Sequence, residues 1–518
     1  MELNENQKLA LATDRHIAVT AGAGTGKTRV LVQRYADIVR SGGADIDNAL
    51  ALTFTEKAAA EMKNRVREEL HKGLLAANGE KELRRAEQLF ESFRDPHIST
   101  FHSFCAAALR EFPIEAGVDP AFTILDEPRA AAGVEQALHD FLDEKNTAGD
   151  PDLRALAALW DRAAIAEKLR ALNASRFPGR RWAERVARLS ADQIENNYHE
   201  LADKWMLAGG GRGAVQNLFD RLRACACHDD GDILAPAYYD ALRFLQQLLD
   251  GADADFDSMA KITARGGKKD SWDDVKVIRS LLPEARALAA KLAAFRFGAK
   301  DAAAAQFARA LARLHLAFLD RCEQSRGRGA ALDFDDLEIK MLQLLEGAPA
   351  ARLALRKRFR YVLIDEFQDT NDIQWEIIRK IAVDEKGRIA CNMFIVGDEK
   401  QSIYAFRGAN VAVFDRARAA MDACNQAEGL GAGRVPLDVC YRSHPALIRF
   451  FNTVFAGIFS AAPAEDFLTK IDYFNIEAGR GDNETDNGPR VEFLLPRESA
   501  GRDPELPSAW ESEAAMAA

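Results

Sequence analysis

The sequence predicts an α/β protein with a parallel sheet and a long all-helical insertion, and three observations support this fold class. Short apolar or β-branched runs alternate with helical stretches in residues 17–111, and the alternation returns after residue 360. Strands that alternate with helices indicate a parallel sheet covered by helices on both faces. A glycine-rich loop follows the first apolar run. Residues 120–329 are rich in Ala, Leu and Arg with few strand signals, which predicts the insertion.

The local hydrophobic pattern also places the elements in order. Two apolar runs end in an aspartate, and we expect them to be central strands. Their aspartates would then lie at the carboxyl ends of the strands, where open α/β sheets bind ligands. Helical periodicity is plain in two stretches of the insertion. We expect strands from 17 and at 49–55, 97–100, 361–365 and 393–398, and helices at 2–13, 29–39, 56–72, 101–111, 285–297, 302–322 and 373–381.

The segment after the first strand has the layout of a phosphate-binding loop. Small residues allow backbone N–H groups to close around phosphate oxygens, and the following helix adds the positive end of its dipole. A lysine and a threonine at the end of the loop suit the β- and γ-phosphates and Mg²⁺. Alanine stands where the strict pattern has its first glycine, and a plain glycine turn is the alternative interpretation. The segment is Ala21, Gly22, Ala23, Gly24, Thr25, Gly26, Lys27 and Thr28.

Composition limits the class of protein. The chain has 518 residues, is 48% hydrophobic and 29% charged, and contains no apolar run of the roughly 18 residues that cross a membrane. The polar, acidic amino terminus is not a signal peptide, so we expect no membrane association and a cytoplasmic location. A net charge of −11 argues against coating of nucleic acid by bulk charge, although a local basic channel stays compatible with it.

Cysteine usage gives no strong metal signal. Seven cysteines are spread along the chain without a C-x-x-C pair. Cys225, Cys227 and His228 form the one cluster, and no second ligand pair lies near it in the sequence. We therefore interpret the cysteines as reduced core thiols rather than as zinc ligands.

Two adjacent carboxylates follow the strand expected at 361–365. ATP hydrolysis needs one carboxylate that holds Mg²⁺ and a base that orients the attacking water, and Asp365 and Glu366 can supply these roles in that order. Acidic residues at strand ends are common, so the two carboxylates alone are a weak signal. Together with the phosphate-binding loop they indicate an ATP-hydrolysing site. For Asp369 the sequence leaves two alternatives open, a capped turn before a helix or a residue that couples the γ-phosphate to nearby loops.

A second dense segment covers residues 397–409. Polar residues that could reach a phosphate are followed by Tyr404, Phe406 and Arg407. Aromatic side chains beside a cation suit single-stranded nucleic acid, because base stacking contributes about 1–3 kcal/mol per base whatever the sequence. Core packing is the alternative for these aromatic residues, and Phe54 presents the same choice at the end of another strand.

Taken together, these segments resemble superfamily 1 DNA helicases of the UvrD/Rep type, and more closely the RecB/AddA large subunits of bacterial helicase–nucleases. Eight segments keep the order of that family. The helical insertion matches by position and helicity rather than by motif. The segments are 6–7, 21–28, 52–59, 99–104, 332–337, 365–370, 397–409 and 440–443.

The resemblance implies ATP and Mg²⁺ as cofactors and gives individual residues a role. In the ATP site, Gln7 reads adenine, Tyr441 stacks on it, and Arg34 belongs to the same site. Lys27 and Thr28 hold the phosphates and, with Asp365, the metal. Catalysis involves Lys27, Asp365, Glu366, the γ-phosphate sensor Gln401, and Arg442, which approaches from the second motor domain. The implied path for single-stranded DNA consists of Phe54, Thr55, Thr100, His102, Tyr404, Phe406 and Arg407.

The resemblance also implies the domain plan of a P-loop NTPase with a RecA-like sheet and part of a second RecA-like domain. The first motor domain would cover residues 1–118 and 329–428, the helical accessory insertion 119–328, and the start of the second motor domain 429–518. We expect strands at 435–440 and 490–496 in this second unit, a loop at 477–488 and the start of a helix at 510–518. The implied partners are single-stranded and duplex DNA and a partner protein of the AddB/RecC type.

The implied activity is that of an ATP-dependent 3′→5′ DNA helicase or translocase in double-strand-break repair or recombination. Two later segments of the family, including a second arginine at the γ-phosphate, are not found before Ala518, nor is a nuclease pattern, so we expect an amino-terminal portion of a longer protein. With Arg442 alone, slow ATP turnover is expected. The alternatives are an ATP-gated DNA-binding or subunit-docking module without helicase activity, and a P-loop ATPase that acts on something other than DNA.

Overall fold

The structure is a computed structural model of the chain and divides into two units. One unit comprises residues 1–130 and 326–518, and the other residues 131–325. The insertion expected at 119–328 therefore has its counterpart in the second unit. The described residues are 2–190, 192–194, 196–197, 200, 211–250, 254–256, 259, 262, 264–293, 299–327, 330–384, 387–405, 408–460 and 473–481.

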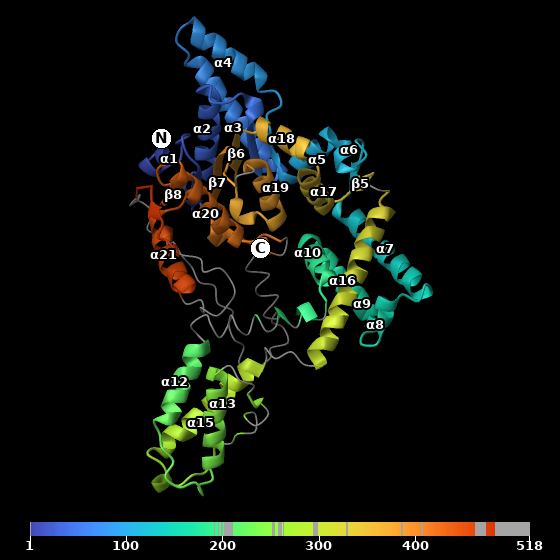
Figure 1. Cartoon of the computed structure of the whole chain (residues 1–518). Coiled ribbons are helices and arrows are strands. Elements are labelled where there is room, and N and C mark those ends of the chain that lie inside the picture. Colours follow the sequence, from blue (N-terminus) through green and yellow to red (C-terminus); the bar gives the residue numbers. More distant parts are fainter. Residues whose placement is uncertain are drawn as a thin grey trace, which may run out of the picture. The chain divides into compact units, whose positions relative to one another are not determined.

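The first unit is built around a six-stranded parallel sheet with the order β3-β2-β6-β7-β1-β8. Figure 1 labels β6, β7 and β8 of this sheet. The inner strands β2, β6 and β7 are almost completely buried, which explains their continuous apolar runs. Because all pairings are parallel, the six carboxyl ends lie at one edge of the sheet. The strands are β1 (Ile17–Ala21), β2 (Ala49–Thr53), β3 (Ile98–Thr100), β6 (Tyr361–Ile364), β7 (Asn392–Gly397) and β8 (Arg434–Leu437).

Helices connect these strands through right-handed crossovers. The chain passes from β1 through α2 to β2 and through α3 to β3 in one direction along the sheet, and it returns through β6, β7 and β8 in the other. Right-handed crossovers then place α2 and α3 on one face and α5, α19 and α20 on the opposite face. The helices are α1 (Glu5–Leu9), α2 (Lys27–Arg40), α3 (Glu56–Leu75), α4 (Glu80–Ser92), α5 (Phe101–Glu111), α6 (Pro113–Ala116), α17 (Phe334–Gly347), α18 (Pro349–Arg358), α19 (Asp372–Ala382), α20 (Ala412–Ala427) and α21 (Pro445–Ser460).

Side-chain caps start several of these helices at the edge where the strands end. The Thr55 and Thr100 side chains accept hydrogen bonds from backbone N–H groups at the starts of α3 and α5. Asp333 and Asn371 form capping boxes at the starts of α17 and α19. Each such cap typically stabilises a helix by about 1 kcal/mol, so these residues fix the positions of the helix starts that surround the edge.

The strand expected at 435–440 does not belong to a second α/β unit. β8 pairs in parallel with β1, with Val19 opposite Val435, and so continues the first sheet. Val435 and Leu437 are buried while the alternate residues are exposed, a pattern that suits an edge strand, and the free side of such a strand tolerates Pro436. The apolar run alone cannot show which sheet a strand joins, and for this strand our prediction was wrong.

Beyond β8 the chain leaves the sheet. The short strand β9 (Val439–Cys440) pairs in parallel with β10 (Glu477–Ala478), which falls in the segment that we expected to be a loop. The strand expected at 490–496 and the helix expected at 510–518 lie outside the described residues.

The named elements among the described residues of the second unit are helices, as predicted. One apolar cluster is formed by α7 (Glu127–Thr147), α8 (Pro151–Ala157), α9 (Arg162–Ala174) and α16 (Ala299–Ser325), with α10 (Arg176–Arg188) packed on α16. A second cluster is formed by α12 (Gly211–Arg223), α13 (Ala235–Asp250) and α15 (Val275–Ala293). In the described part of the chain, none of the helices combines the length and the hydrophobicity that crossing a membrane requires.

Candidate functional site

The glycine-rich loop after β1 adopts a conformation that needs glycine at two positions. Gly24 has φ of +74° and Gly26 has φ of +91°, a region that side chains other than glycine rarely enter. Gly26 is the N-cap of α2, and the first N–H groups of this helix have no carbonyl partner within it. The loop therefore presents backbone donors and the positive end of a helix dipole to one place, as an anion site requires.

Segments from the far end of the chain lie directly against this loop. The N–H group of Tyr441 donates to the carbonyl of Gly24 at 2.9 Å. A Cβ atom at Gly24 would lie 2.7 Å from Cβ of Arg442, and one at Gly22 would lie 2.7 Å from Cδ1 of Ile476. Small loop residues are thus needed for close packing as well as for backbone conformation, and the loop brings Tyr441 and Arg442 to the predicted ATP site.

Gln7, which we predicted to read adenine, is buried and holds the loop from the other side. Its Nε2 atom donates to the carbonyl of Thr25 at 3.0 Å, and its Oε1 atom accepts from the N–H group of Asn4 at 3.1 Å. The Asn4 side chain also donates to the Tyr441 hydroxyl at 3.0 Å. The start of α1, the loop and Tyr441 are therefore linked, and the link passes through Asn4, which the sequence did not indicate.

Lys27 forms an ion pair with Glu366 across the carboxyl edge of the sheet. The Nζ and Oε2 atoms are 3.0 Å apart, and the lysine side chain is 11% exposed. Glu366 has the backbone conformation φ +48°, ψ +45°, which is uncommon outside glycine and turns its side chain sharply away from the line of β6. The structure thus brings together the lysine and the carboxylate that we expected to act on the γ-phosphate and on water.

Asp365 lies next to this pair and is nearly completely buried. Burial, together with the neighbouring charge of Glu366, raises the pKa of Asp365 to about 6, although Lys27 and the N–H group of Glu366 oppose the shift. The surroundings of this buried carboxylate leave most of its negative charge uncompensated. Such a group is a suitable ligand for a cation. Asp365 with the Thr28 hydroxyl offers the oxygen donors that Mg²⁺ prefers, so the residues present fit the metal.

We expect Asp365→Asn to stabilise the nucleotide-free protein while preventing metal-dependent hydrolysis. Because the pKa is higher in the folded state than the ordinary value of 3.8, the ionised carboxylate destabilises the fold above pH 6 and this penalty disappears as the pH falls to about 4. The gain should be about 3 kcal/mol at pH 8 and should shrink between pH 6 and pH 4. Thermal unfolding at several pH values measures it.

The control for this prediction is Glu87→Gln, which neutralises an exposed carboxylate on α4. It should leave the unfolding temperature nearly unchanged at every pH. A stability gain of Asp365→Asn that does not depend on pH would show that burial of charge is not its cause.

Gln368 joins the carboxylates to the segment that follows β7. Its Nε2 atom donates to Glu366 at 2.9 Å, and its Oε1 atom accepts from the N–H group of Asp398 at 2.8 Å. A Cβ atom at Gly397 would lie 2.5 Å from this oxygen, so a larger residue here would displace the Gln368 amide. Asp398 in turn accepts from the Gln401 side chain at 2.6 Å. The expected γ-phosphate sensor Gln401 is therefore connected to Glu366 through two intervening residues, the Gln368 side chain and the N–H group and carboxylate of Asp398.

Asp369, for which we left two alternatives, lies in this connection. It belongs to the 3₁₀ turn Phe367–Asp369, and Gln368 Nε2 also donates to it at 3.3 Å. Burial and the charge of Glu366 raise its pKa to about 6. The N-cap of the following helix is Asn371 and not Asp369, and the coupling role of Asp369 stays a prediction.

The expected nucleic-acid side of the same edge carries a pair of aromatic rings. Phe54, after β2, and Tyr404, after β7, have ring centroids 4.7 Å apart with planes inclined by 30°. Both rings are half-buried, and the neighbouring Ile403 is 70% exposed. Rings that remain partly exposed at a sheet edge suit stacking on a base better than core packing. Phe406 and Arg407 lie outside the described residues.

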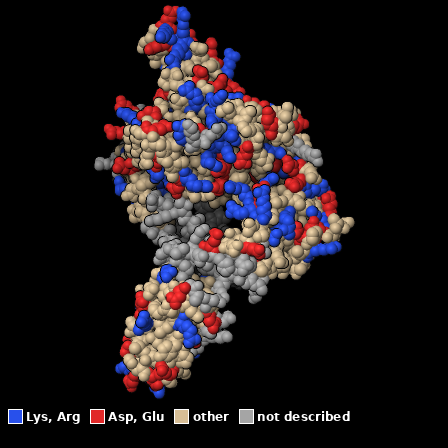
Figure 2. Space-filling view, viewed as in Figure 1, with Lys and Arg blue, Asp and Glu red and all other residues tan. Residues whose placement is uncertain are grey.

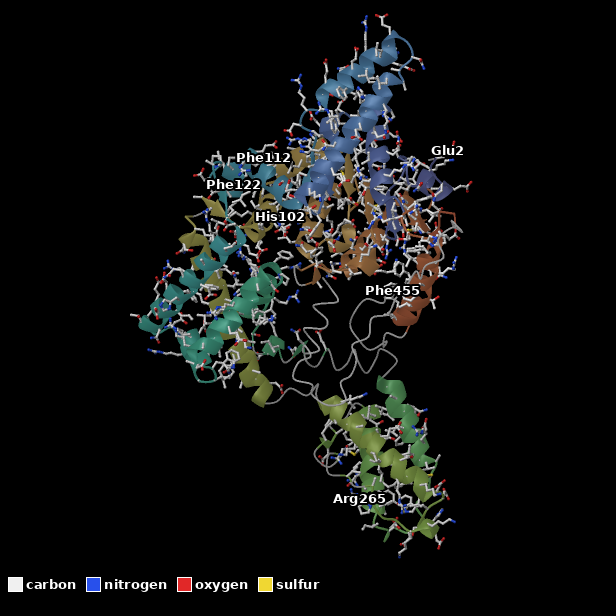
Figure 3. All side chains as sticks on the ribbon, turned by 180° about the vertical axis from the view of Figure 1, so that it is seen from behind. Glu2, His102, Phe112, Phe122, Arg265 and Phe455 are labelled. Atoms are coloured by element: carbon white, nitrogen blue, oxygen red, sulfur yellow. The ribbon has the colours of Figure 1, made fainter. Side chains whose placement is uncertain are left out.

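The other predicted DNA contacts differ in exposure. His102, which Figure 3 labels, lies at the start of α5 and keeps 37% of its side chain exposed. Its ring lies beside that of Phe334. Thr55 is exposed, although its hydroxyl oxygen already caps α3. Thr100 is buried, and its hydroxyl donates to Glu56 at 2.7 Å while it accepts from the N–H group of Ser103. We therefore assign Thr100 to the fold and not to a DNA surface.

Arg34 is a further correction. Its guanidinium is completely buried, lies 4.9 Å from the ring centre of Phe394, and donates to the Ala10 and Ala12 carbonyls and to Asn392. Burial lowers its pKa to about 9. These donors tie α2 to β7 and to the segment before β1, so the prediction of a nucleotide contact was wrong for Arg34.

Known proteins resemble this chain over most of its length. The model of the UvrD/REP helicase N-terminal domain matches residues 3–422. The A subunit of the ATP-dependent helicase/nuclease of Desulforudis audaxviator is 30% identical over 493 residues, which cover 87% of this chain and 39% of that protein. The proteins of the same name from Bacillus anthracis and Ligilactobacillus salivarius are each 29% identical, over 88% and 79% of this chain and 39% and 35% of their own length.

The chain thus spans about two fifths of the length of these relatives. The family match covers the loop, both carboxylates, Gln401 and the paired aromatic rings, and it extends over most of the chain. On these grounds the chain belongs to the UvrD/REP helicase family.

Proposed function

We propose that the chain binds ATP with Mg²⁺ and couples its hydrolysis to movement along single-stranded DNA, as part of a DNA helicase of double-strand-break repair or recombination. The observation that carries this proposal is the position of the Lys27–Glu366 pair and the Phe54–Tyr404 pair at the same edge of one parallel sheet. The phosphate-binding site and the aromatic surface for base stacking are therefore connected by a few short loops at this edge.

The ATP half of the site works through residues with separate tasks. The N–H groups at the start of α2 and Lys27 hold the β- and γ-phosphates, and Asp365 with Thr28 holds Mg²⁺, which neutralises charge on the phosphates. Glu366 accepts the proton of the attacking water, and Gln401 contacts the γ-phosphate. Tyr441 and Gln7 hold the base, and Arg442, which is exposed beside Gly24, stabilises charge in the transition state.

The DNA half relies on stacking rather than on bulk charge. Figure 2 shows positive and negative side chains interspersed over the first unit, so no extended basic face is visible in this view. Phe54 and Tyr404 supply base-stacking faces, and Thr55 and His102 supply polar contacts. The family resemblance adds Phe406 and Arg407 to the residues that contact DNA. Movement in the 3′→5′ direction and a partner protein of the AddB/RecC type complete the proposal. The family resemblance supports both, and the names of the relatives, which describe one subunit of a helicase/nuclease, support the partner.

We expect Phe54→Ala and Tyr404→Ala each to weaken binding of oligo(dT) about tenfold, because each removes one stacking surface. The slope of log Kd against log salt concentration should stay nearly unchanged, since stacking releases few counterions. Fluorescence anisotropy at several salt concentrations measures both quantities. The matched control is Phe455→Ala, which removes a 41% exposed ring on α21 (Figure 3).

Two outcomes separate this proposal from the alternatives. If single-stranded DNA does not stimulate ATP turnover, and Phe54→Ala and Tyr404→Ala bind it normally, the chain is an ATPase that acts on something else. If single-stranded DNA binds and the affinity depends on nucleotide but turnover is never stimulated, the chain is an ATP-gated binding module. Stimulated turnover, reduced by both variants, supports the translocase.

A further inference from the structure

Glu338 is a buried carboxylate that the ATP and DNA roles above do not use. It lies on α17 and is 3% exposed. Its Oε1 atom is 3.2 Å from Nε2 of His102, the histidine at the start of α5 (Figure 3). The ring of His102 lies 4.8 Å from that of Phe334, which is 46% exposed. Glu338 therefore supports, from inside the protein, a histidine whose outer side faces solvent.

The same carboxylate also holds the start of α19. The side chain of Gln374 donates to its Oε1 atom at 2.7 Å, and that of Asn371 donates to its Oε2 atom at 3.2 Å. Asn371 and Gln374 form the capping box of α19. One buried carboxylate thus contacts three side chains from two helices, which places the starts of α5 and α19 in a fixed relation.

Asn371 lies two residues after the 3₁₀ turn Phe367–Asp369, which directly follows the catalytic carboxylates and is called the catalytic turn below. The 3₁₀ turn Phe367–Asp369 joins Glu366 to Thr370, and the carbonyl of Thr370 accepts from the N–H group of Asn410 at 3.2 Å. Asn371 also forms a β-bridge with Ala409, in the segment that carries Tyr404. The start of α19 is therefore in contact with the ATP side of the edge and with the aromatic segment.

We propose that Glu338 is a positioning residue that couples the DNA-facing His102 to the catalytic turn through Asn371 and Gln374. This inference rests on the proposed function, because it assigns His102 to the DNA side and Glu366 to the ATP side. A change in the position or the charge of His102 alters the hydrogen bonds of Glu338, and these determine where α19 and the preceding turn lie.

A purely structural role does not account for the charge. The cap of α19 is complete with the Asn371 and Gln374 side chains, and neither needs an ionised partner. A buried carboxylate is costly unless donors surround it. Its charge matters for His102, whose pKa is raised: partial burial opposes the protonated ring, but the hydrogen bond and charge of Glu338 and the charges of Asp335 and Glu56 outweigh it.

The test is Glu338→Gln in the full chain, with oligo(dT) binding measured with and without Mg²⁺ and a non-hydrolysable ATP analogue. The proposed function requires that the analogue change the affinity of the unaltered protein for DNA by about fivefold or more. Glu338→Gln keeps the shape of the side chain but replaces one acceptor oxygen by an NH₂ donor. This donor then faces the donors of His102, Asn371 and Gln374. We expect the analogue's effect to fall to about twofold or less, while the affinity for the analogue itself without DNA stays the same.

A pH profile distinguishes positioning from a loss of packing. Oligo(dT) affinity of the unaltered protein should fall as the pH rises and His102 loses its proton. In Glu338→Gln the midpoint should move to lower pH, since the nearest negative charge is gone while Asp335 and Glu56 remain. His102→Gln should remove the pH dependence in this range. Glu346→Gln, which neutralises an exposed carboxylate of the same helix that pairs with Lys380, is the matched control and should change neither quantity.

The outcomes distinguish a failure of the proposed function from a failure of the coupling role of Glu338. If the unaltered protein shows no effect of nucleotide on DNA binding, the proposed function fails. If that effect is present and Glu338→Gln retains both it and the pH midpoint, Glu338 is structural and the coupling role is refuted. If Glu338→Gln also lowers the unfolding temperature, the conservative variant Glu338→Asp, which keeps the charge, should restore the pH midpoint at least partly. A midpoint that stays low in Glu338→Asp would contradict the proposal.

Discussion

Lys27→Ala is expected to abolish ATP turnover and to weaken the binding of ATP with Mg²⁺. Lys27 is a cation at the start of α2 whose Nζ atom lies 3.0 Å from Glu366, and ATP phosphates placed at the loop would take over this partner. Removing a preorganised donor to the charge that develops in a transition state lowers turnover by about 10²–10³. Single-turnover hydrolysis with oligo(dT) present and equilibrium binding of a fluorescent ATP analogue measure the two effects.

Lys27→Ala should also change the stability of the nucleotide-free protein. The charge of Lys27 lowers the pKa values of Asp365 and Asp369, which burial and Glu366 raise to about 6. Without the lysine, these carboxylates are expected to hold protons to higher pH. Lys27→Ala should therefore be less stable than the unaltered protein at pH 8, and Lys27→Ala combined with Glu366→Gln should recover part of the loss. Full turnover by Lys27→Ala would contradict the assignment of the loop.

The loop and the catalytic carboxylates could be predicted because their signals are local. Gly24 and Gly26 are required by the φ angles of one short loop, and Asp365 and Glu366 stand at the end of one apolar run. In a parallel sheet the carboxyl ends of all strands lie at one edge. The loop and the carboxylates can therefore be expected at the same edge even when the strand order is unknown. The helical character of the second unit followed equally from the local pattern, since its helices alternate apolar and polar faces.

The connections within the site could not be predicted because they join positions far apart in the chain. Glu338 is separated by 236 positions from His102, and Gln368 by 30 from Asp398. The capping patterns around Asp333 and Asn371 indicate helix starts, but they do not show which side chain a third element will bring into contact. The same limit explains Arg34: a sequence shows an arginine near a phosphate-binding loop, and only the fold shows that it is buried behind that loop.

Glu366→Gln is expected to separate ATP binding from hydrolysis. If Glu366 accepts the proton of the attacking water, its loss should lower turnover by about 10²–10⁴, which is the usual contribution of a general base. Glutamine keeps the volume and one oxygen, so the hydrogen bond from Gln368 can persist. The affinity for ATP with Mg²⁺ should stay the same or rise, because Lys27 no longer has to leave an ionised partner before it binds phosphate.

Rapid-quench hydrolysis and titration with ATP under the same conditions measure the two quantities, and Asp369→Asn, which neutralises a second carboxylate of the same connection, is the comparison variant. Asp369 lies three positions away, on the same turn, and also has a raised pKa, but it has no ion pair with Lys27 among the described residues. If both variants lose turnover equally, the carboxylates act as one electrostatic group and Glu366 is not the specific base. If Glu366→Gln alone loses it and retains ATP, then the lysine–glutamate pair of the nucleotide-free protein is a resting arrangement. In that case ATP activates the base by removing Lys27 from it.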